Sequence, residues 1–476
     1  MTALPSLIRS AIFSLGCVVV LSGCTYYAVR PLRPETTAAQ LDARSLSDPE
    51  LRSFMETNLH RAFIQWPPAQ WDFDTLTLVA FYYHPNMAVA RAQWNVAQAG
   101  IKTAGGRPNP TLTVTPGYDT THNAGLSPWF PAVNFDLPIE TAGKRGHRIA
   151  VAQQLSESAR LNIATVAWQV RSRLRRSLLD LYAAREAEGL LQRQQAAQAE
   201  IVRLLEAQLA AGEVSPFEAT QARIAQVNTL LALRDAERQR DEAHAQIASA
   251  LGLPASAVDA DLSFTGLIQP PTELPSADLR RQALLHRADI LGALAEYAAA
   301  ESTLRLEIAK QYPDIHINPG YQFDQGDSKW SVGISIELPV LNQNQGPIAE
   351  AKAKREEVAA RFIALQAGVL GDLDRTVAGY RAALGKAMTA DALLANLKKQ
   401  EQTIQARFEA GDISRLEMSA VQLELSQSAL TRLDALVKTQ QAFGELEDVL
   451  QSPVGWINAL ELVSPGNATR KERKHE

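Results

Sequence analysis

Cysteine is nearly absent from this sequence: Cys17 and Cys24 are the only two among 476 residues. Cys17 lies within a short apolar run close to the N-terminus and would leave with a cleaved signal peptide. The mature chain would then hold one cysteine. A single cysteine excludes a disulfide framework and a cysteine-ligated metal site within one subunit.

The sequence also lacks a long hydrophobic run and an excess of charge of one sign. The apolar run at residues 11–20 is far shorter than the about 20 residues that a membrane-spanning helix needs, but it suits the apolar core of a signal peptide. The 47 basic and 52 acidic residues nearly balance, and no basic stripe indicates a nucleic-acid partner. We therefore expect a cleaved signal peptide and no bound nucleic acid.

The apolar run ends in Leu21-Ser22-Gly23-Cys24, which resembles the bacterial lipobox, where small residues before the cysteine admit the lipoprotein peptidase. The resemblance implies diacylglycerol and palmitate on Cys24 and no other cofactor; each buried CH2 of these chains would contribute about 0.8 kcal/mol to anchoring. Thr25 stands where an aspartate would retain a lipoprotein in the inner membrane. We therefore expect a lipid-anchored protein of the outer membrane that extends into the periplasm. The alternative is an ordinary signal peptide with a cysteine there by chance.

One unit is written twice in the chain. Residues 210–218 (AAGEVSPFE) match residues 409–417 (EAGDISRLE) at an offset of 199, and the predicted strands match at offsets of 201 to 203. A nearly constant offset indicates a duplicated unit. We predict a signal peptide at 1–23, an N-terminal lipid-anchored segment at 24–71, a first repeat at 72–253, a linker at 254–276, a second repeat at 277–452 and a C-terminal tail at 453–476.

Each repeat contains two segments in which apolar and polar residues alternate, within about 111–138 and 314–339. A period of two over about ten residues per segment is typical of a β-strand with one apolar face, and this length also suits a strand that crosses a membrane. The alternative is an amphipathic hairpin packed on a soluble core. Four strands cannot close a barrel, for which about eight is the minimum, so membrane strands would be shared among several subunits.

Very long helices follow the strands. Residues 145–211 contain no proline, and at about 1.5 Å per residue such a helix would extend over roughly 100 Å. The second repeat has a similar segment at 345–410. The predicted helical hairpins span about 145–252 and 346–451. In each hairpin a glycine would end the long helix and a serine would cap the returning helix: Gly212 and Ser215, then Gly411 and Ser414.

The lengths and the periodicity of the helices predict two further features. The helices before the strands, at about 75–104 and 277–310, are short, and each would stack end to end with a returning helix alongside the long one. Apolar residues of the returning helices recur every seven positions, which predicts coiled-coil packing within each hairpin. They are Phe217, Ile224 and Leu231 in the first repeat, and Leu416, Leu423, Leu430 and Val437 in the second.

Over essentially the whole mature chain, this duplicated arrangement resembles the TolC-like outer-membrane efflux proteins. Residues 137–146 (LPIETAGKRG) and 338–346 (LPVLNQNQG) are similar to segments common in the cobalt–zinc–cadmium efflux branch of that family. The resemblance implies a mainly helical homotrimer in which twelve strands form one membrane β-barrel on an α-barrel of twelve helices. The linker and the chain ends, with part of 24–71, would form an equatorial belt.

The same resemblance implies the function and the partners. The trimer would be the passive exit duct of a tripartite efflux pump. Its helical tips would meet a periplasmic membrane-fusion (adaptor) protein bound to an inner-membrane RND transporter. Divalent metal cations are the first expectation for the cargo, and drugs or organic toxicants are the alternative. A periplasmic coiled-coil adaptor or scaffold lipoprotein is the rival interpretation, but two hairpins with two strand pairs favour the channel.

No enzyme is expected, because the sequence offers no nucleophile constellation, phosphate loop or metal cluster. The resemblance implies an acidic ring at the periplasmic aperture, with Glu417 and its repeat counterpart Glu218 as candidates. Both could instead be first-turn residues that favour the helix macrodipole. His84 and His286 match between the repeats, and a structural role is favoured over a metal site because no second ligand follows at helical spacing. The barrel lumen would be lined by His316, Asn318, Gln322 and Glu337.

Overall fold

The computed structural model describes residues 26–120, 127–258, 261–269 and 279–453. Cys24, the predicted acylation site, lies outside these residues. The chain divides into two compact units, residues 1–44 and 45–476. In the first unit the described part is an irregular segment followed by one short helix, α2 (Pro34–Asp42), which begins at a proline.

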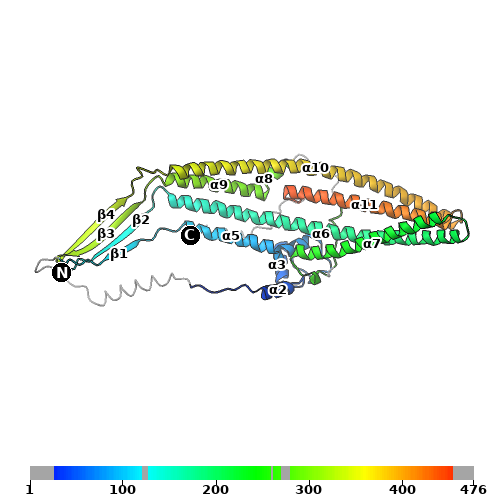
Figure 1. Cartoon of the computed structure of the whole chain (residues 1–476), viewed down its shortest axis with the longest axis horizontal. Helices are drawn as coiled ribbons and strands as arrows, with labels where there is room; N and C mark the ends of the chain where they lie inside the picture. Colours follow the sequence, from blue (N-terminus) through cyan, green and yellow to red (C-terminus); the bar gives the residue numbers. More distant parts are fainter. Residues whose placement is uncertain (1–25, 121–126, 259–260, 270–278, 454–476) are drawn as a thin grey trace. The chain divides into compact units, whose positions relative to one another are not determined.

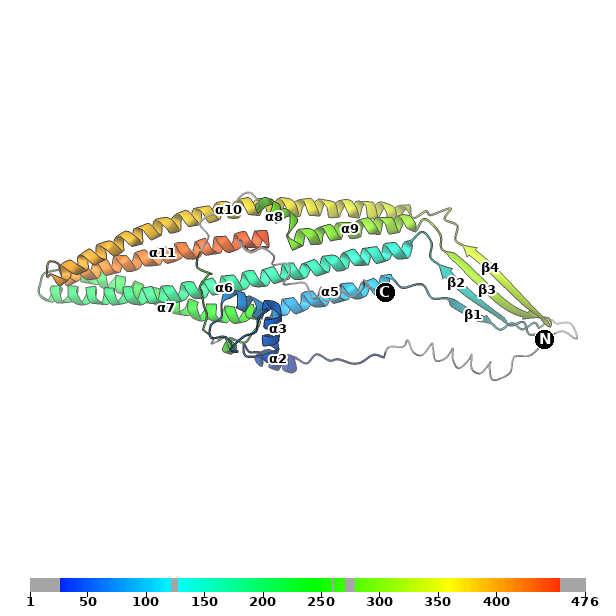
Figure 2. The same ribbon diagram turned by 180° about the vertical axis from the view of Figure 1, so that it is seen from behind.

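The second unit contains the predicted repeat (Figures 1 and 2). In each half a helix leads into two strands, a very long helix and a returning helix. The first half contains α5 (Pro85–Ala104), β1 (Thr111–Thr115), β2 (Ala132–Ile139), α6 (Lys144–Ala210) and α7 (Pro216–Leu251). The second half contains α9 (Ala288–Ala309), β3 (Ile315–Asp324), β4 (Asp327–Ile336), α10 (Gln345–Glu409) and α11 (Arg415–Leu450). The remaining helices are α3 (Pro49–Leu59), α4 (Phe73–Tyr83), η1 (Ala255–Ala257) and α8 (Leu279–Leu285).

The long helices α6 and α10 comprise 67 and 65 residues, and each ends in a Schellman motif. At the first tip Gly212 is left-handed (φ 77°), and the Glu213 N–H donates to the Gln208 carbonyl at 2.9 Å. The same arrangement forms around Gly411 (φ 81°) at the second tip. A residue without a Cβ therefore reverses the chain at both tips. Among the residues that the structure describes, no helix combines the length and the hydrophobicity needed to cross a bilayer.

The first short helix before the strands is broken, so the prediction of one helix over 75–104 is wrong. α4 and α5 meet at His84, which is extended (ψ 126°) because Pro85 disfavours helical backbone in the residue before it. His84 Nδ1 accepts a hydrogen bond from the Asn86 N–H at 3.2 Å and so caps α5. The His84 side chain is buried, and burial lowers its pKa.

The second short helix is broken at the matching place, so the prediction of one helix over 277–310 is also wrong. His286 and Arg287 separate α8 from α9, and Arg287 is extended (ψ 131°). The cap of α9 comes from the end of the repeat, because Gln451 Oε1 accepts a hydrogen bond from the Ala288 N–H at 3.0 Å. The two matched histidines therefore mark matching breaks in the helices.

The long helix of the first repeat lies at the centre of the helical layer. α6 packs against α5 and α7 of its own repeat and also against α9 and α11 of the second repeat. α10 packs against α9 and α11. These contacts give the order α7, α6, α11, α10, which can be followed beside the labels of these helices in Figures 1 and 2. In this order α7 and α10 are edge helices, and α6 with α11 forms the contact between the repeats.

The heptad residues of the first repeat do not pack as predicted. In the first repeat Phe217, Ile224 and Leu231 are exposed, and Leu233 packs on α6 in their place. In the second repeat Leu430 packs on the same cluster of the first hairpin as Leu233. The prediction that Phe217, Ile224 and Leu231 hold the first hairpin together is therefore wrong, because a seven-residue period reveals an apolar row but not the helix that covers it.

The four strands form one antiparallel sheet in the order β1-β2-β3-β4. In the body of the sheet the register sets apolar residues opposite apolar ones and polar residues opposite polar ones, which gives an apolar and a polar face. The apolar face is open: Trp330, Val332 and Ile334 are 70–80% exposed. This exposure argues against the alternative of a hairpin packed on a soluble core.

The main hydrophobic core lies at the middle of α6, where residues before the first repeat meet the linker after it. Trp71 is 1% exposed within this core. Its N–H donates to the Asp261 carbonyl at 3.0 Å, and the Ser263 N–H donates to the Trp71 carbonyl at 2.9 Å. These bonds join two segments that are far apart in the sequence and hold both against the middle of the long helix.

Candidate functional site

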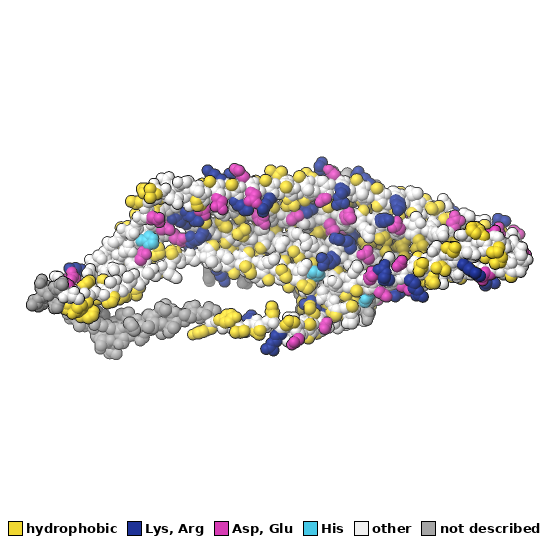
Figure 3. Space-filling model, viewed as in Figure 1, with side chains coloured by type: hydrophobic (Ala, Val, Ile, Leu, Met, Phe, Trp, Pro, Cys, Tyr) yellow, Lys and Arg dark blue, Asp and Glu magenta, His cyan; other side chains and the backbone are white. Residues whose placement is uncertain are grey.

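Two surfaces of the second unit differ from the rest in the side chains that they present. Hydrophobic side chains gather at the far end of the sheet and at the tips of the hairpins, whereas charged side chains are spread along the helices (Figure 3). The sheet and the tips are also the places where the sequence predicts functional residues.

The polar face of the sheet holds three of the four predicted lumen residues. His316, Asn318 and Gln322 alternate along β3 and share one face. His316 Nδ1 lies 2.8 Å from Asp136 Oδ1 of β2, so the two repeats share a polar contact on this face. Glu337 lies one residue beyond the end of β4 and is exposed. The structure therefore groups the first three residues and leaves Glu337 at the margin of the sheet.

Charged residues form hydrogen bonds and an ion pair at the junction between the sheet and the long helix of the first repeat. Lys144 Nζ lies 2.8 Å from Asp314 Oδ1, and the Thr141 N–H donates to the same carboxylate at 2.9 Å. Arg145 Nε donates to the Gly105 carbonyl at 2.7 Å. The segment at 137–146 is thus a structural corner: it joins β2 to α6, to the end of α5 and to the start of β3.

The predicted aperture residues occupy the first turns of the returning helices. The Glu417 carboxylate accepts a hydrogen bond from the Ser414 N–H at 2.9 Å, and Ser414 Oγ accepts one from the Glu417 N–H at 3.1 Å, which makes a capping box. In the first repeat Ser215 Oγ accepts from the Glu218 N–H at 3.3 Å, and Ser215 Oγ donates to Glu218 Oε1 at 3.3 Å. Both glutamates are exposed, and each makes a local capping contact with the serine before it.

One interaction at the tips was missed by sequence reasoning. Arg415 Nε of α11 donates to Glu200 Oε1 of α6 at 2.8 Å, and Arg203 donates to the same carboxylate. The hydrogen bonds from Arg203 and Arg415 lower the pKa of Glu200 to about 2. This ion pair joins the two hairpins close to their tips. A sequence signal existed, since Arg415 stands where the first repeat has Pro216, but only the fold shows what it contacts.

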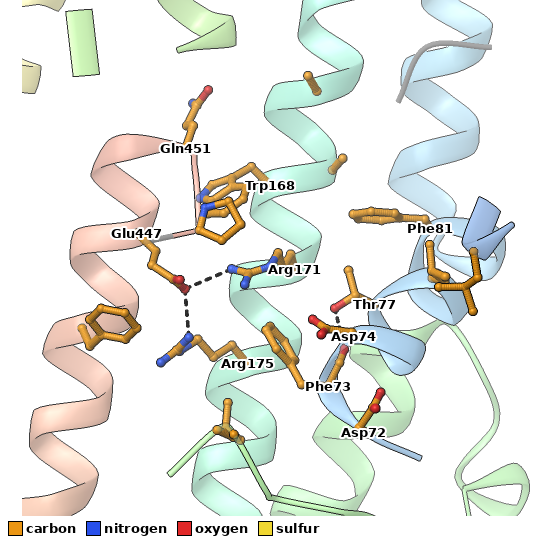
Figure 4. Close-up of a pocket in the computed structure, with 18 of the residues that line it drawn as sticks. Asp72, Phe73, Asp74, Thr77, Phe81, Trp168, Arg171, Arg175, Glu447 and Gln451 are labelled. Carbon is orange, nitrogen blue, oxygen red and sulfur yellow. Dashed lines mark hydrogen bonds and ion pairs between the residues drawn. The ribbon is translucent and has the colours of Figure 1, made fainter. Parts of the chain in front are cut away.

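A cavity of about 550 Å³ lies at the middle of the unit, between α4, α6, the linker and the ends of α9 and α11 (Figure 4). The Arg171 guanidinium lies 4.7 Å from the ring centres of both Phe73 and Trp168. Arg171 and Arg175 both donate to Glu447 Oε2, at 3.1 and 2.8 Å. The cavity thus borders a cluster in which two cations of the first repeat share one carboxylate of the second.

This cluster is deeply buried. Arg175 is 7% exposed and Glu447 is 3% exposed. Burial lowers the pKa of Arg175, while the charge of Glu447 opposes that shift. Gly444 lies directly against the cluster: a Cβ there would lie 3.0 Å from Arg175 Nε, so the Arg175 side chain would have to shift slightly to admit one. Sequence reasoning missed this cluster because its members lie on helices of different repeats.

The arrangement contains no recognisable catalytic or metal chemistry in the described residues. No group of three or more His, Cys, Asp or Glu side chains within them could hold a metal ion. The buried charges of the cluster are paired across the two repeats: Arg171 and Arg175 of the first repeat donate to Glu447 of the second. The polar face of the sheet can line a passage, and the ion pairs between the repeats stabilise the packing of the helices.

Comparison with known proteins agrees with this picture. The sequence profile of the family described as "Outer membrane efflux protein" matches residues 81–253 and 279–450, the two repeats. The chain is 26% identical to the cobalt-zinc-cadmium resistance protein CzcC of Cupriavidus metallidurans over 370 residues, which cover 77% of this chain and 86% of that protein. It is 23% identical to the probable outer membrane lipoprotein SilC of Salmonella typhimurium, over 90% of this chain and 95% of that protein. The outer-membrane channel OprN has the same fold, with a TM-score of 0.64 and 16% identity over 90% of this chain and 98% of that one.

Proposed function

The chain belongs to the outer membrane efflux protein family, and we propose that three copies form the outer-membrane exit duct of a tripartite efflux pump. The observation that carries this proposal is the four-stranded sheet, which has one apolar face open to the surroundings and one polar face. Four strands cannot close, whereas twelve strands from three copies can form a barrel with lipid outside and water inside. The two long helical hairpins of each copy would continue the duct into the periplasm.

The residues divide among the parts of this duct. His316, Asn318 and Gln322 would line the barrel, because they share the polar face of the sheet. The tips at Gly212 and Gly411 would contact a periplasmic adaptor protein, and an inner-membrane RND transporter would supply the energy. The duct itself would conduct passively, so its own residues need only offer a polar wall and an adjustable aperture.

We infer that the cargo is divalent metal cations. The name of the relative from C. metallidurans supports this inference, as do the two segments that resemble the metal efflux branch. Deletion of the gene should lower the tolerated concentrations of cobalt, zinc and cadmium, and a plasmid copy should restore them. The tolerated concentrations of dyes and antibiotics serve as the control and should stay the same. Loss of tolerance to these organic compounds alone would contradict the metal assignment.

We also propose that Cys24 carries the lipid anchor. Growth with radioactive palmitate should label the wild-type chain, and Cys24→Ser should abolish the label because the acylated thiol is lost. Cys17→Ser is the matched control, since it removes a cysteine that leaves with the signal peptide, and it should retain the full label. Equal labelling of the two variants would show that the acyl groups lie elsewhere.

Glu417 is proposed as the acidic ring of the aperture. Three copies of Glu417→Gln should lower the preference for cations over anions in planar bilayers, because three carboxylates near the symmetry axis would be lost. Ser414→Ala is the control, since it removes the capping hydroxyl that accepts from the Glu417 N–H and keeps the charge. If both variants changed the selectivity equally, or neither did, Glu417 would act only as a helix cap.

A further inference from the structure

The described part of the first unit forms no core of its own. Every residue of 26–43 is exposed, and α2 buries none of its side chains. Four large apolar residues nevertheless lie close together in the segment before α2: Tyr26, Tyr27, Val29 and Leu32 are 90%, 90%, 71% and 89% exposed. We call these four residues the anchor-proximal cluster. Exposed apolar side chains that gather in this way mark a surface that binds another molecule or a membrane.

The place of the anchor-proximal cluster in the chain limits what can cover it. Tyr26 and Tyr27 are the second and third residues after Cys24, the proposed site of the lipid anchor. An extended chain spans at most about 3.6 Å per residue, so both tyrosines lie within roughly 11 Å of the acylated residue. Acyl chains that are buried in the bilayer hold this residue at the level of the lipid headgroups. The two tyrosines are therefore confined to the surroundings of the headgroups.

The residue types of this segment suit a membrane surface. A tyrosine combines an apolar ring with a polar hydroxyl, and tyrosines are enriched where a membrane meets water. Arg30 and Arg33 are the only charged residues from Thr25 to Pro34, so this stretch carries two positive charges and no negative one. Basic residues beside a membrane are attracted to anionic headgroups. Both the aromatic and the charged side chains thus match a phospholipid surface.

The composition of the chain changes where α2 begins. α2 (PETTAAQLD) has Glu35 in its first turn, and Leu41 is its only large apolar residue. Apolar and basic residues therefore come first after Cys24, and polar and acidic residues follow them. This order is expected if a membrane covers the anchor-proximal cluster, because the chain can move away from the membrane only as it extends from its anchor.

We propose that the anchor-proximal cluster inserts into the headgroup region of the periplasmic leaflet and forms a second anchor beside the acyl chains. This inference rests on the proposed lipid anchor at Cys24 and adds the side chains that bind the phospholipid. Arg30 and Arg33 contact anionic headgroups, and the chain leaves the membrane surface where α2 begins. The partner of this surface is therefore phospholipid, and the first unit needs no core because the membrane covers its apolar side chains.

Quenching of fluorescence by lipid tests the insertion in the full-length protein. Ala28→Cys places a thiol within the cluster, and the matched control Ala38→Cys places one in α2; both positions are exposed. Each is the single free thiol of the mature chain if Cys17 leaves with the signal peptide and Cys24 is acylated. The variants are labelled with an environment-sensitive fluorophore and reconstituted in vesicles of phosphatidylethanolamine and phosphatidylglycerol. Brominated phospholipid should quench most of the emission at residue 28 and little at residue 38. An unquenched residue 28, or equal quenching at both positions, would overturn the proposal.

Substitution of the tyrosines tests whether they cause the insertion. Tyr26→Ser with Tyr27→Ser, in the Ala28→Cys background, should remove most of the quenching, whereas Leu41→Ser in α2 should leave it unchanged. Full quenching without the tyrosines would show that the acyl chains alone hold this segment. Slow reaction of Ala28→Cys with a water-soluble maleimide, without quenching by lipid, would show that protein covers the cluster instead. Absence of palmitate from the wild-type chain would contradict the proposed anchor at Cys24, whereas a palmitate label with an unquenched residue 28 would overturn this inference alone.

Discussion

We expect Glu447→Ala to destabilise the protein by about 3–5 kcal/mol, the range for removing one partner of a buried ion pair. Glu447 is 3% exposed and accepts hydrogen bonds from Arg171 and Arg175 at the contact between the two repeats. Its loss would leave the buried Arg175 cation without a carboxylate. The thermal midpoint of the detergent-solubilised protein, followed by the helical circular dichroism signal, should fall clearly below that of the wild type.

Glu445→Ala provides the control on the same helix. The Glu445 side chain is 58% exposed and lies 3.6 Å from Arg375, so its removal should cost about 0–1 kcal/mol. Equal losses of stability in the two variants would show that the buried cluster stabilises the protein no more than an exposed ion pair does. The double variant Arg175→Met with Glu447→Met should recover part of the loss, because buried ion pairs can be replaced by apolar side chains of similar volume at little cost.

This cluster also shows what the sequence could not predict. The duplication, the long helices and the alternating strands are visible in the sequence because period and length are local properties. The order α7, α6, α11, α10 is a tertiary property, and no pattern within one helix identifies its neighbour. Arg175 and Glu447 are 272 residues apart, and each taken alone is an ordinary charged residue of a long helix.

The two errors in the helices have different origins. The break at His84 overrides a helical pattern because Pro85 disfavours helical backbone in the preceding residue, although the apolar period continues across it. The apolar residues Phe217, Ile224 and Leu231 of α7 were identified correctly, but their packing partner was assigned to the same hairpin, and all three are exposed. Glu417 shows a third limit of prediction from sequence. Its capping box is evident from the sequence S-R-L-E at 414–417. A position near a pore axis depends instead on the other copies in the assembly, which the sequence of one chain does not describe.

We expect Gly252→Ala to be the second strongly destabilising change, with a loss of about 2–4 kcal/mol from left-handed backbone strain and overpacking together. Gly252 ends α7 with φ 73°, and a Cβ there would lie 2.8 Å from the Tyr83 carbonyl oxygen and 3.0 Å from His84 Cα. Both contacts are with backbone, so no side chain can turn away to make room. The end of α7 would have to separate from the break between α4 and α5.

Gly212→Ala separates the two causes of that loss. Gly212 has nearly the same backbone conformation (φ 77°), but nothing lies within 4 Å of the position that its Cβ would take. Its substitution should therefore cost only the left-handed strain, about 1–2 kcal/mol. The difference between the two thermal midpoints, measured in the same detergent, isolates the contact between α7 and the break at His84. Equal midpoints would mean that the backbone of Tyr83 and His84 moves away from a Cβ at residue 252 at no cost in stability. The contact between the end of α7 and the break at His84 would then contribute nothing to stability.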